Sequence, residues 1–525
     1  MKQAFQQSMT WLHTWSSLLL IWILFAIFFA GTLAFFRVEI THWMQPESHA
    51  SAPSEESLQV ALDYLTEHAP NAKSWQISLP DSRTRTTGVS WENYNEERQR
   101  RRGPREIINA DSGDPIDNRE TAGGGFLYRF HFELYHIPRG TARLLVGIAT
   151  MMMFVGIITG LFTRRKLFAH FFTYRPGKNL LSWIDAHVVT GLMALPFHIM
   201  ITFSGLILFA NTLLFLNTDD NRGRFDRGRD NARAVKEVVP PTVDNWQPNI
   251  NAMIAHAQQQ WGQEVSDIRI DNPRQSNASF SVESGTQDSL TAGRNGHASM
   301  SFNYDGQPIE HQAAEKADNV ISATYSSLRQ LHEAHFADTT MRWLFFFCGV
   351  LGTFMVASGA ILWVIKRARQ QLGQFGFELV SALNVGGIAG LICATGSLFW
   401  ANRLLPVGIA ERRDWEINVF FITWGICLLY AVFSRHRKGW TALLALASAL
   451  YITIPLLDQF TSPVSLLQAF KIGDWIRLGF DGIALLFGFG MFTAFYYLAL
   501  RDENGGFRLA TFKPFASNKH KEETC

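Results

Sequence analysis

Eight long apolar runs constrain the fold of this chain more than any other feature of its sequence. A bilayer core of about 30 Å is crossed by roughly 20 apolar residues in helical form. The runs lie near residues 14–36, 142–163, 186–214, 341–365, 379–401, 415–434, 439–457 and 476–500. Backbone groups in lipid must find partners within the chain, so each run predicts an α-helix. We therefore expect an α-helical polytopic membrane protein with about eight transmembrane helices.

Basic residues in the loops between these runs indicate the orientation of the helices. Short cytoplasmic loops of membrane proteins carry an excess of lysine and arginine. Such residues follow the second, fourth and sixth runs: Arg164, Arg165, Lys166, Arg175 and Lys178; Lys366, Arg367 and Arg369; and Arg435, Arg437 and Lys438. In a bacterium this pattern predicts a multi-pass inner-membrane protein with both termini in the cytoplasm. The first run is too long for a typical signal peptide and is expected to remain as a span.

Two polar segments separate the first four spans, and we expect them to form modules in the periplasm. The expected organisation is span one at 1–36, a periplasmic module at 37–140, span two at 141–163, a cytoplasmic loop at 164–182, span three at 183–214, a second periplasmic module at 215–338, span four at 339–365, a four-helix membrane region at 375–500 and a cytoplasmic tail at 501–525. A net charge of +2 gives no indication of a nucleic-acid partner.

Matched spacings relate the first two spans to the next two. In spans one and three a histidine precedes a glycine by eighteen residues, and in spans two and four an arginine precedes a glycine by seventeen. The matched pairs are His13 and Gly31, His187 and Gly205, Arg143 and Gly160, and Arg342 and Gly359. The pattern indicates an internal duplication of 1–166 and about 183–369, because several spacings recur together.

The two polar segments repeat one order of local patterns. Each begins with helical periodicity, continues into an alternating run that ends at proline, and later contains an Asp/Gly/Pro turn. These features lie at 58–65, 75–80 and 111–116 in the first segment, and at 250–257, 267–273 and 304–309 in the second. We therefore predict two small α+β modules. Parallel repeats of this kind predict a pseudo-two-fold axis along the membrane normal.

Four histidines near the ends of the first four helices are the candidate metal ligands. Histidine is costly within a bilayer, so its presence there is a hypothesis of function. A bis-histidine haem takes two imidazoles from opposite sides of one iron. The repeat pairs His13 with His187 near the cytoplasmic face, and His131 with His332 near the periplasmic face. We expect two b-type haems stacked across the membrane. The sequence lacks the Cys-x-x-Cys-His motif of covalently attached haem.

Three other histidines remain alternatives. His136 lies five residues beyond His131 and can replace it as a ligand, and His335 lies about one helical turn beyond His332. His198 lies about three turns deeper in span three than the histidine that begins it. It is an alternative ligand, a side chain between the two haems, or a hydrogen-bonded buried histidine.

Two arginines, Arg143 and Arg342, begin spans two and four at the expected periplasmic face. A guanidinium group matches a carboxylate with two parallel hydrogen bonds, so these residues are candidate partners of haem propionates. Their long side chains can equally reach from the helix end to the membrane surface without binding a ligand.

Several short motifs together carry a resemblance to a known family. They are Trp11-Leu-His13-Thr-Trp15, Arg143-Leu-Leu-Val-Gly147, Asp185-Ala-His187, Ala194-Leu-Pro-Phe-His198, and Leu331-His332 with Gly349 and Gly359. As a set they resemble the PepSY-associated transmembrane (PepSY_TM) family of bacterial inner-membrane proteins, over about residues 1–370. The resemblance implies PepSY-like periplasmic modules, haem held by the four paired histidines, and an iron-related role. Members include haem-dependent ferric-siderophore reductases. The four further spans at 375–500 depart from the four-helix members.

Two functions from different classes follow. The first is a haem-dependent ferric-chelate reductase, which passes electrons from a cytoplasmic reductase or a quinol to a ferric siderophore in the periplasm. The arginine-rich stretch 98–105 can attract an anionic chelate, although a solvated charged loop explains it more simply. The second is a non-enzymatic sensor or an assembly partner. A proton-coupled transporter is disfavoured, because Asp185 is one of few acidic residues in the spans.

Overall fold

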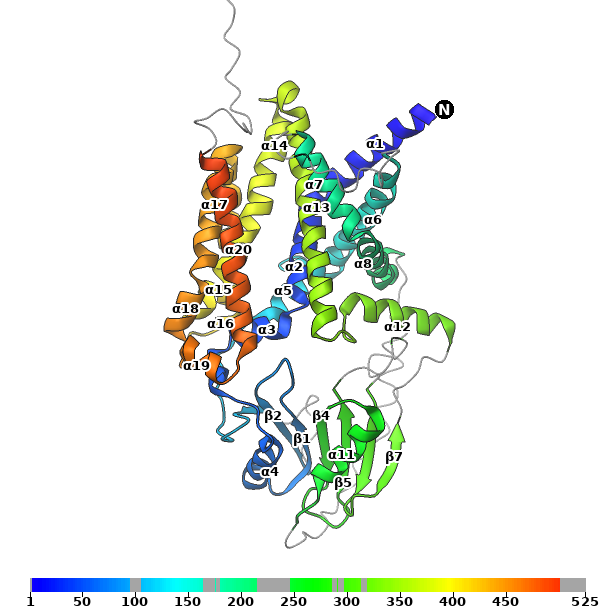
Figure 1. Cartoon of the computed structure of the whole chain (residues 1–525), viewed down its shortest axis with the longest axis vertical. Helices are drawn as coiled ribbons and strands as arrows, with labels where there is room; N and C mark the ends of the chain where they lie inside the picture. Colours follow the sequence, from blue (N-terminus) through cyan, green and yellow to red (C-terminus); the bar gives the residue numbers. More distant parts are fainter. Residues whose placement is uncertain are drawn as a thin grey trace, which may run out of the picture.

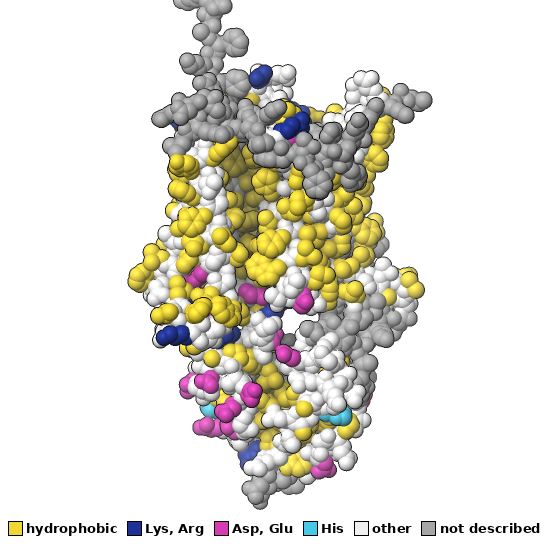
Figure 2. All heavy atoms as spheres, viewed as in Figure 1, with side chains coloured by type: hydrophobic (Ala, Val, Ile, Leu, Met, Phe, Trp, Pro, Cys, Tyr) yellow, Lys and Arg dark blue, Asp and Glu magenta, His cyan; other side chains and the backbone are white. Residues whose placement is uncertain are grey.

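The computed structural model describes residues 2–94, 105–163, 175, 180–214, 246–285, 290, 297–312 and 319–500. Long helices lie side by side in one body, and a single β-sheet lies beyond one end of them (Figure 1). We call the end of the helices next to the sheet the sheet side, and the other end the opposite side. Figure 2 shows apolar side chains over the helical body and acidic side chains gathered towards the sheet. The chain is a polytopic membrane protein.

The expected eight spans are the upper limit of what the structure contains. Within the described residues, six helices are long and apolar enough to cross a bilayer, or up to eight if each of two bent pairs is one span. The first pair is α1 (Lys2–Leu19) with α2 (Ile21–Ala34), bent by 68°; the second is α7 (Leu180–Met193) with α8 (Leu195–Leu208), bent by 69°. Pro196 lies in the first turn of α8 and explains the second bend. No proline marks the first bend, at Leu20.

Two straighter helices return from the sheet side. They are α6 (Arg139–Thr163) and α13 (Thr339–Gln371). Each follows a short helix on the sheet side, α5 (Gly123–Glu133) before α6 and α12 (Val320–Glu333) before α13. Both short helices end in a residue with left-handed backbone geometry. In Figure 1 α12 runs across the ends of the spans.

The C-terminal region forms four more spans beside the first group. The first is α14 (Phe375–Asn384), a π-helical turn η3 (Val385–Ala389) and α15 (Gly390–Leu404). The second is α16 (Arg412–Phe433), the third α17 (Arg437–Ile452) with α18 (Ile454–Thr461), and the fourth α20 (Trp475–Leu500), preceded by α19 (Leu466–Lys471). The predicted seventh run at 439–457 thus extends to Thr461, with a break at Thr453 before Pro455.

A buried cluster of charged side chains ties these C-terminal helices to the sheet side. Asp458 accepts hydrogen bonds from Arg403 at 2.8 Å and from Arg477 at 2.6 Å, and all three side chains are fully buried. Arg403 also donates to the carbonyl of Trp43 in α3 (Arg37–Trp43), which continues the chain after α2. The short helix η1 (Pro46–Ala50) follows. The C-terminal region is therefore joined to α3 by a hydrogen bond from Arg403, which belongs to this ion-pair cluster.

The two polar segments share one antiparallel sheet of order β3-β2-β1-β4-β5-β6-β7. The strands are β1 (Ala72–Ser78), β2 (Thr87–Asn93), β3 (Arg105–Ile108), β4 (Val265–Asp271), β5 (Ser279–Ser284), β6 (Ser299–Asn303) and β7 (Pro308–Gln312). The alternating runs predicted at 75–80 and 267–273 are β1 and β4, and they pair directly, with Ile77 opposite Ile268. Helices α4 (Ser57–His68) and α11 (Ile250–Trp261) confirm the two predicted helical patterns. Together they bury the core of the sheet.

The predicted turns are present. Gly113 and Gly306 have φ of +78° and +77°, which glycine adopts without steric cost. The amide of Gly306 donates to the carbonyl of Asn303 at the turn between β6 and β7. Residues 98–102 of the arginine-rich stretch, the basic residues Arg164 to Lys166 and Lys178, and the tail 501–525 lie outside the described part of the chain.

Candidate cofactor-binding site

On the opposite side of the helical body, His13 and His187 face one another across a cavity. His13 comes from α1 and His187 from α7, so each lies in the first half of a bent span. The two ring centroids are 6.3 Å apart, and the ring planes are inclined by 67°. The cavity between α1, α6, α7 and α13 has an empty volume of about 1610 Å³, counting the part that is open to solvent.

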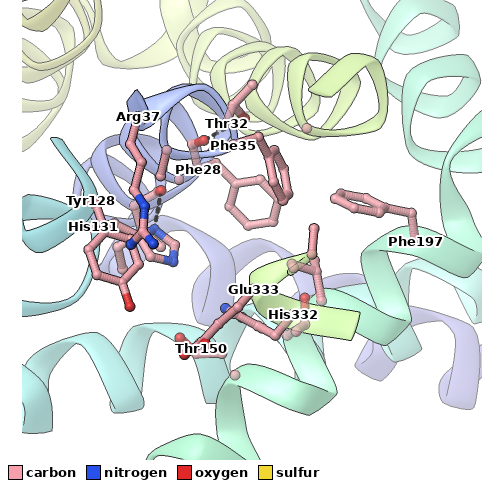
Figure 3. Close-up of a pocket in the computed structure, with 18 of the residues that line it drawn as sticks. Phe28, Thr32, Phe35, Arg37, Tyr128, His131, Thr150, Phe197, His332 and Glu333 are labelled. Atoms are coloured by element: carbon pink, nitrogen blue, oxygen red, sulfur yellow. Dashed lines mark hydrogen bonds between the residues drawn. The ribbon is translucent and has the colours of Figure 1, made fainter. Parts of the chain in front are cut away.

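On the sheet side, His131 and His332 form a second pair. They come from the short helices α5 and α12. Their ring centroids are 6.2 Å apart, with an interplanar angle of 37°. Both line a cavity of about 1180 Å³, again counting the open part, whose walls include Phe28, Phe35 and Phe197 (Figure 3). The sequence pairing of the four histidines is thus the pairing seen in space.

Each of the four rings is held by a hydrogen bond at Nδ1. Nδ1 of His13 lies 2.8 Å from the carbonyl of Gly156, and that of His131 lies 2.6 Å from the carbonyl of Ile27. For His187 the acceptors are the carbonyl of Met355 at 2.9 Å and the hydroxyl of Ser358 at 3.1 Å. Nδ1 of His332 lies 2.8 Å from the hydroxyl of Ser204. A ring that donates from Nδ1 presents the lone pair of Nε2 as a ligand, which is the usual arrangement in metal-binding histidines.

The glycines of the repeat pack against these rings. A Cβ atom added to Gly31 would lie 2.6 Å from the ring of His131, and one added to Gly205 would lie 3.2 Å from that of His332. Gly160 and Gly359 have the same relation to the rings on the opposite side, at 3.2 Å from His13 and 3.3 Å from His187. Each glycine of the sequence pattern therefore makes room for a different histidine.

The spacing of each pair fits two ligands on one metal ion. A metal–imidazole bond is about 2 Å long, and with the ring radius this places two opposed ring centroids roughly 6 to 6.5 Å apart. The observed separations, 6.2 and 6.3 Å, lie in that range. No group of three or more His, Cys, Asp and Glu side chains suited to a metal ion occurs among the described residues. Each pair thus supplies two imidazole ligands.

Basic side chains line both cavities. Arg342, expected as a propionate partner, is buried and lines the sheet-side cavity with Arg37 and Arg83. Lys366 and Arg367 line the opposite cavity. Lys366 and Arg367 directly follow the apolar run of span four, and from the sequence their positive charge indicated only the orientation of that span.

Two predicted site residues lie away from the cavities. Arg143 binds Glu133 at 2.8 Å and lines neither cavity. His136 has φ of +53°, which turns it away from His131, and its ring packs against Phe421 with centroids 4.8 Å apart. The geometry thus brings His131, and not His136, opposite His332.

Two further histidines lie near the pairs. His335 lines the sheet-side cavity and binds Glu333 at 3.0 Å. His198 lies in α8, is 1% exposed, and lines the opposite cavity. Its Nε2 is buried without a hydrogen-bond partner, and its ring lies 6.4 Å from that of Phe28, which lines the other cavity. His198 is therefore placed between the two cavities.

Electrostatics on the sheet side favour neutral imidazoles. Burial lowers the pKa of His131, and burial together with the neighbouring His131 lowers the pKa of His332 to about 4. The pKa of Glu333 is lowered to about 2; burial opposes this shift, and hydrogen bonds from His335 and Arg329 outweigh it. Neutral imidazole is the form that binds a metal ion.

The two cavities approach each other closely in the middle of the helical body. Leu24 of α2 and Met153 of α6 line both of them. The two cavities therefore share two apolar wall residues.

Comparison with known proteins adds one finding. The model of a family described as the PepSY-associated TM region matches residues 10–366, which is more than half of the chain. No curated protein matches the sequence. The matched residues include all four paired histidines and their four glycines.

Proposed function

The chain belongs to the PepSY-associated TM family, and we propose that it is a di-haem electron-transfer protein of the membrane. His13 and His187 would hold one b-type haem, and His131 and His332 would hold the other. The observation that carries the proposal is the separation of 6.3 Å and 6.2 Å between the paired rings. When bound, haem supplies a one-electron ferric/ferrous couple at each pair.

The surroundings of both pairs support haem over a bare metal ion. A macrocycle needs a wide apolar space between its axial ligands, and aromatic and aliphatic side chains line both cavities. Its propionates need cations, which Arg37 and Arg342 offer on the sheet side and Lys366 and Arg367 on the opposite side, whereas Arg83 on the sheet side already binds Glu39 at 2.8 Å. The Nδ1 hydrogen bonds hold the ring orientations, and the apolar side chains of Leu24 and Met153 line both cavities.

An internal duplication explains why the pairs are alike. We propose that 1–166 and about 183–369 are two copies of one unit, related by a pseudo-two-fold axis. Three observations support it: the glycine contacts of the four histidines, the bends of 68° and 69° seven residues after His13 and His187, and the direct pairing of β1 with β4.

We infer the direction of electron transfer from the positions of basic residues at the ends of the spans. Lys366, Arg367 and Arg369 end α13 on the opposite side, which supports the cytoplasm there and the periplasm on the sheet side. In this orientation both termini are cytoplasmic, and the membrane is a bacterial inner membrane. Electrons would pass from a cytoplasmic reductase or a quinol to an acceptor near the sheet.

We propose a ferric siderophore, or a similar iron chelate, as the acceptor. The support is the family resemblance, together with basic residues at the sheet-side cavity that suit an anionic chelate. Reduction transfers one electron to Fe(III), and the softer Fe(II) binds oxygen-donor chelators less tightly. The side chains on this path need only hold cofactors and substrate in place, so no general acid or base is required.

The visible spectrum of the purified chain tests the proposal. We expect a Soret band, sharp α-bands after reduction, and two haems per chain. His187→Ala should lose the haem of the opposite side, and His332→Ala that of the sheet side. His136→Ala is the matched control and should keep both. A colourless preparation would contradict the proposal and favour a sensor or assembly role.

A further inference from the structure

A shallow hollow opens beside the cavity of His13 and His187. It lies between α1 and the end of α13, and its empty volume is about 870 Å³, most of it open. Thr10, Thr14 and Arg367 line both the hollow and the cavity. A molecule in the hollow would therefore lie next to the opposite-side pair, although it would not occupy the space between the two imidazoles.

The other side chains of the hollow suit a flat ring with oxygen substituents. Gln3 and Gln7 supply side-chain amides, and Trp11 and Trp15 supply aromatic faces. Gln6 also lines the hollow, but its amide donates a hydrogen bond to the carbonyl of Thr163 at 2.8 Å. Trp11 is 63% exposed and Trp15 46%. Aromatic faces stack on planar rings, while amide groups donate hydrogen bonds to ring oxygens.

The charges of the hollow disfavour a nucleotide. Its lining contains no acidic residue and a single basic one, Arg367. The Arg367 guanidinium already lies over the rings of Trp363 and Trp15, at 4.5 and 5.9 Å from their centroids. A flavin or nicotinamide nucleotide carries phosphates that need several donors or cations, whereas an uncharged quinol needs none.

The position of the hollow favours a ligand that arrives through lipid. It lies on α1, the first half of the bent pair that α1 forms with α2, and the exposed side chains of α1 include Phe5 and Leu19, at 52% and 68% exposure. Tryptophans are also typical of the membrane–water interface, where the ring of a lipid quinol can lie. An interfacial belt alone would account for Trp11 and Trp15, but it would not account for the amides of Gln3 and Gln7 in the same hollow.

We propose that this hollow binds the ring of a membrane quinol, the electron donor of the protein. The inference rests on the proposed function, because the chain needs an electron donor only if it transfers electrons. Oxidation of one quinol to quinone releases two electrons and two protons. The electrons match two one-electron reductions of ferric iron, and the protons pass to water on the same side.

Photolabelling tests the site without any need for haem. Membranes containing the full chain would be irradiated with an azidoquinone, and the adducts mapped by mass spectrometry. We expect an adduct within residues 3–15 that excess unlabelled quinone prevents. The double variant Gln7→Leu/Trp11→Leu should lower labelling about tenfold, whereas Trp475→Leu, whose side chain is equally exposed at 63%, should not.

Three outcomes would overturn the inference. The first is adducts confined to other segments, and the second is undiminished labelling of the double variant. The third is competition by reduced flavin mononucleotide that is as strong as competition by quinone, because this result would assign the hollow to a soluble donor. A colourless protein that is still labelled at residues 3–15 would refute the proposed haem function and keep the quinol site. A protein with two haems that is labelled only in other segments would support the proposed haem function and refute the quinol site.

Discussion

The imidazole of His131 lies directly against the backbone of Gly31. A Cβ atom on residue 31 would come within 2.6 Å of both Nδ1 and Cε1 of this ring. The same Nδ1 is hydrogen-bonded to the carbonyl of Ile27, one turn earlier in α2. The carbonyl of Ile27 therefore holds the ring through a hydrogen bond, and the absence of a side chain at Gly31 leaves space for it. Helix α2 thus determines how far His131 enters the sheet-side cavity.

Gly31→Ala should therefore displace His131. The added methyl group cannot be accommodated at 2.6 Å, and moving the ring would break its hydrogen bond to Ile27. We expect about one haem per chain in place of two, with the sheet-side haem lost, measured by the pyridine haemochrome assay. Gly425→Ala is the control, because a Cβ there meets no atom within 4 Å. Two intact haems in Gly31→Ala would show that this contact does not position a ligand.

The pairing of the histidines could be predicted from the sequence because it depends on helical spacing. His13 and His187 begin bent spans of the same construction, and the glycines eighteen residues later lie against the other pair of histidines. Such repeated spacings can be recognised without knowledge of tertiary contacts, because the rise per residue of a helix is fixed.

Other features depend on tertiary structure and could not be predicted. His136 follows two residues with positive φ, Leu134 and Tyr135, so its direction cannot be deduced from its distance to His131. Arg143 was an equal candidate to Arg342, but Glu133 binds it. The pairing of β1 with β4 joins strands from two separate segments, and local alternation of side chains carries no information on such a partner.

His198→Leu should leave both haems in place. The residue is buried, its Nε2 has no partner, and Nδ1 makes a long contact of 3.3 Å to the carbonyl of Gly191. A buried polar atom without a partner costs about 1–3 kcal/mol, so leucine should be tolerated or should raise the thermal midpoint. Loss of one haem in this variant, with normal folding by circular dichroism, would make His198 a ligand.

Asp458→Asn should strongly destabilise the C-terminal region. Asp458 forms ion pairs with both Arg403 and Arg477, and all three side chains are fully buried. Removing one partner of a buried ion pair costs about 3–5 kcal/mol, because the remaining charge stays desolvated. Thermal unfolding in detergent should show a markedly lower midpoint.

An exposed ion pair provides the control for this variant. Arg269 binds Asp271 at 2.9 Å, with side chains 51% and 38% exposed. Asp271→Asn should change stability by about 1 kcal/mol at most, since water screens the pair. Equal effects of the two substitutions would mean that the buried cluster does not hold the C-terminal helices in place.

The contact between α3 and the start of α20 should weaken in acid. Asp474 lies 3.1 Å from Nε2 of His42, and its carboxylate is fully buried. Burial alone would raise its pKa, but the hydrogen bond and charge of His42 and the charge of Arg85 outweigh this and leave the pKa below its usual value of 3.8. A lowered folded-state pKa means that the unfolded chain binds the proton more tightly. The stabilisation is therefore complete well above pH 3.8 and is lost as the pH falls through the folded-state pKa.

The variant Asp474→Asn distinguishes the contribution of Asp474 to acid sensitivity from the contributions of the other carboxylates. The thermal midpoint of the wild-type chain in detergent should fall between about pH 5 and pH 3. The variant should start from a lower midpoint at pH 7, because Arg85 and His42 lose a charged partner, and it should show a shallower fall over the same interval. The cause is that asparagine binds no proton in either state. Parallel curves for the two proteins would place the acid sensitivity elsewhere, whereas convergence of the curves towards pH 3 would assign it to the buried contact of Asp474 with His42.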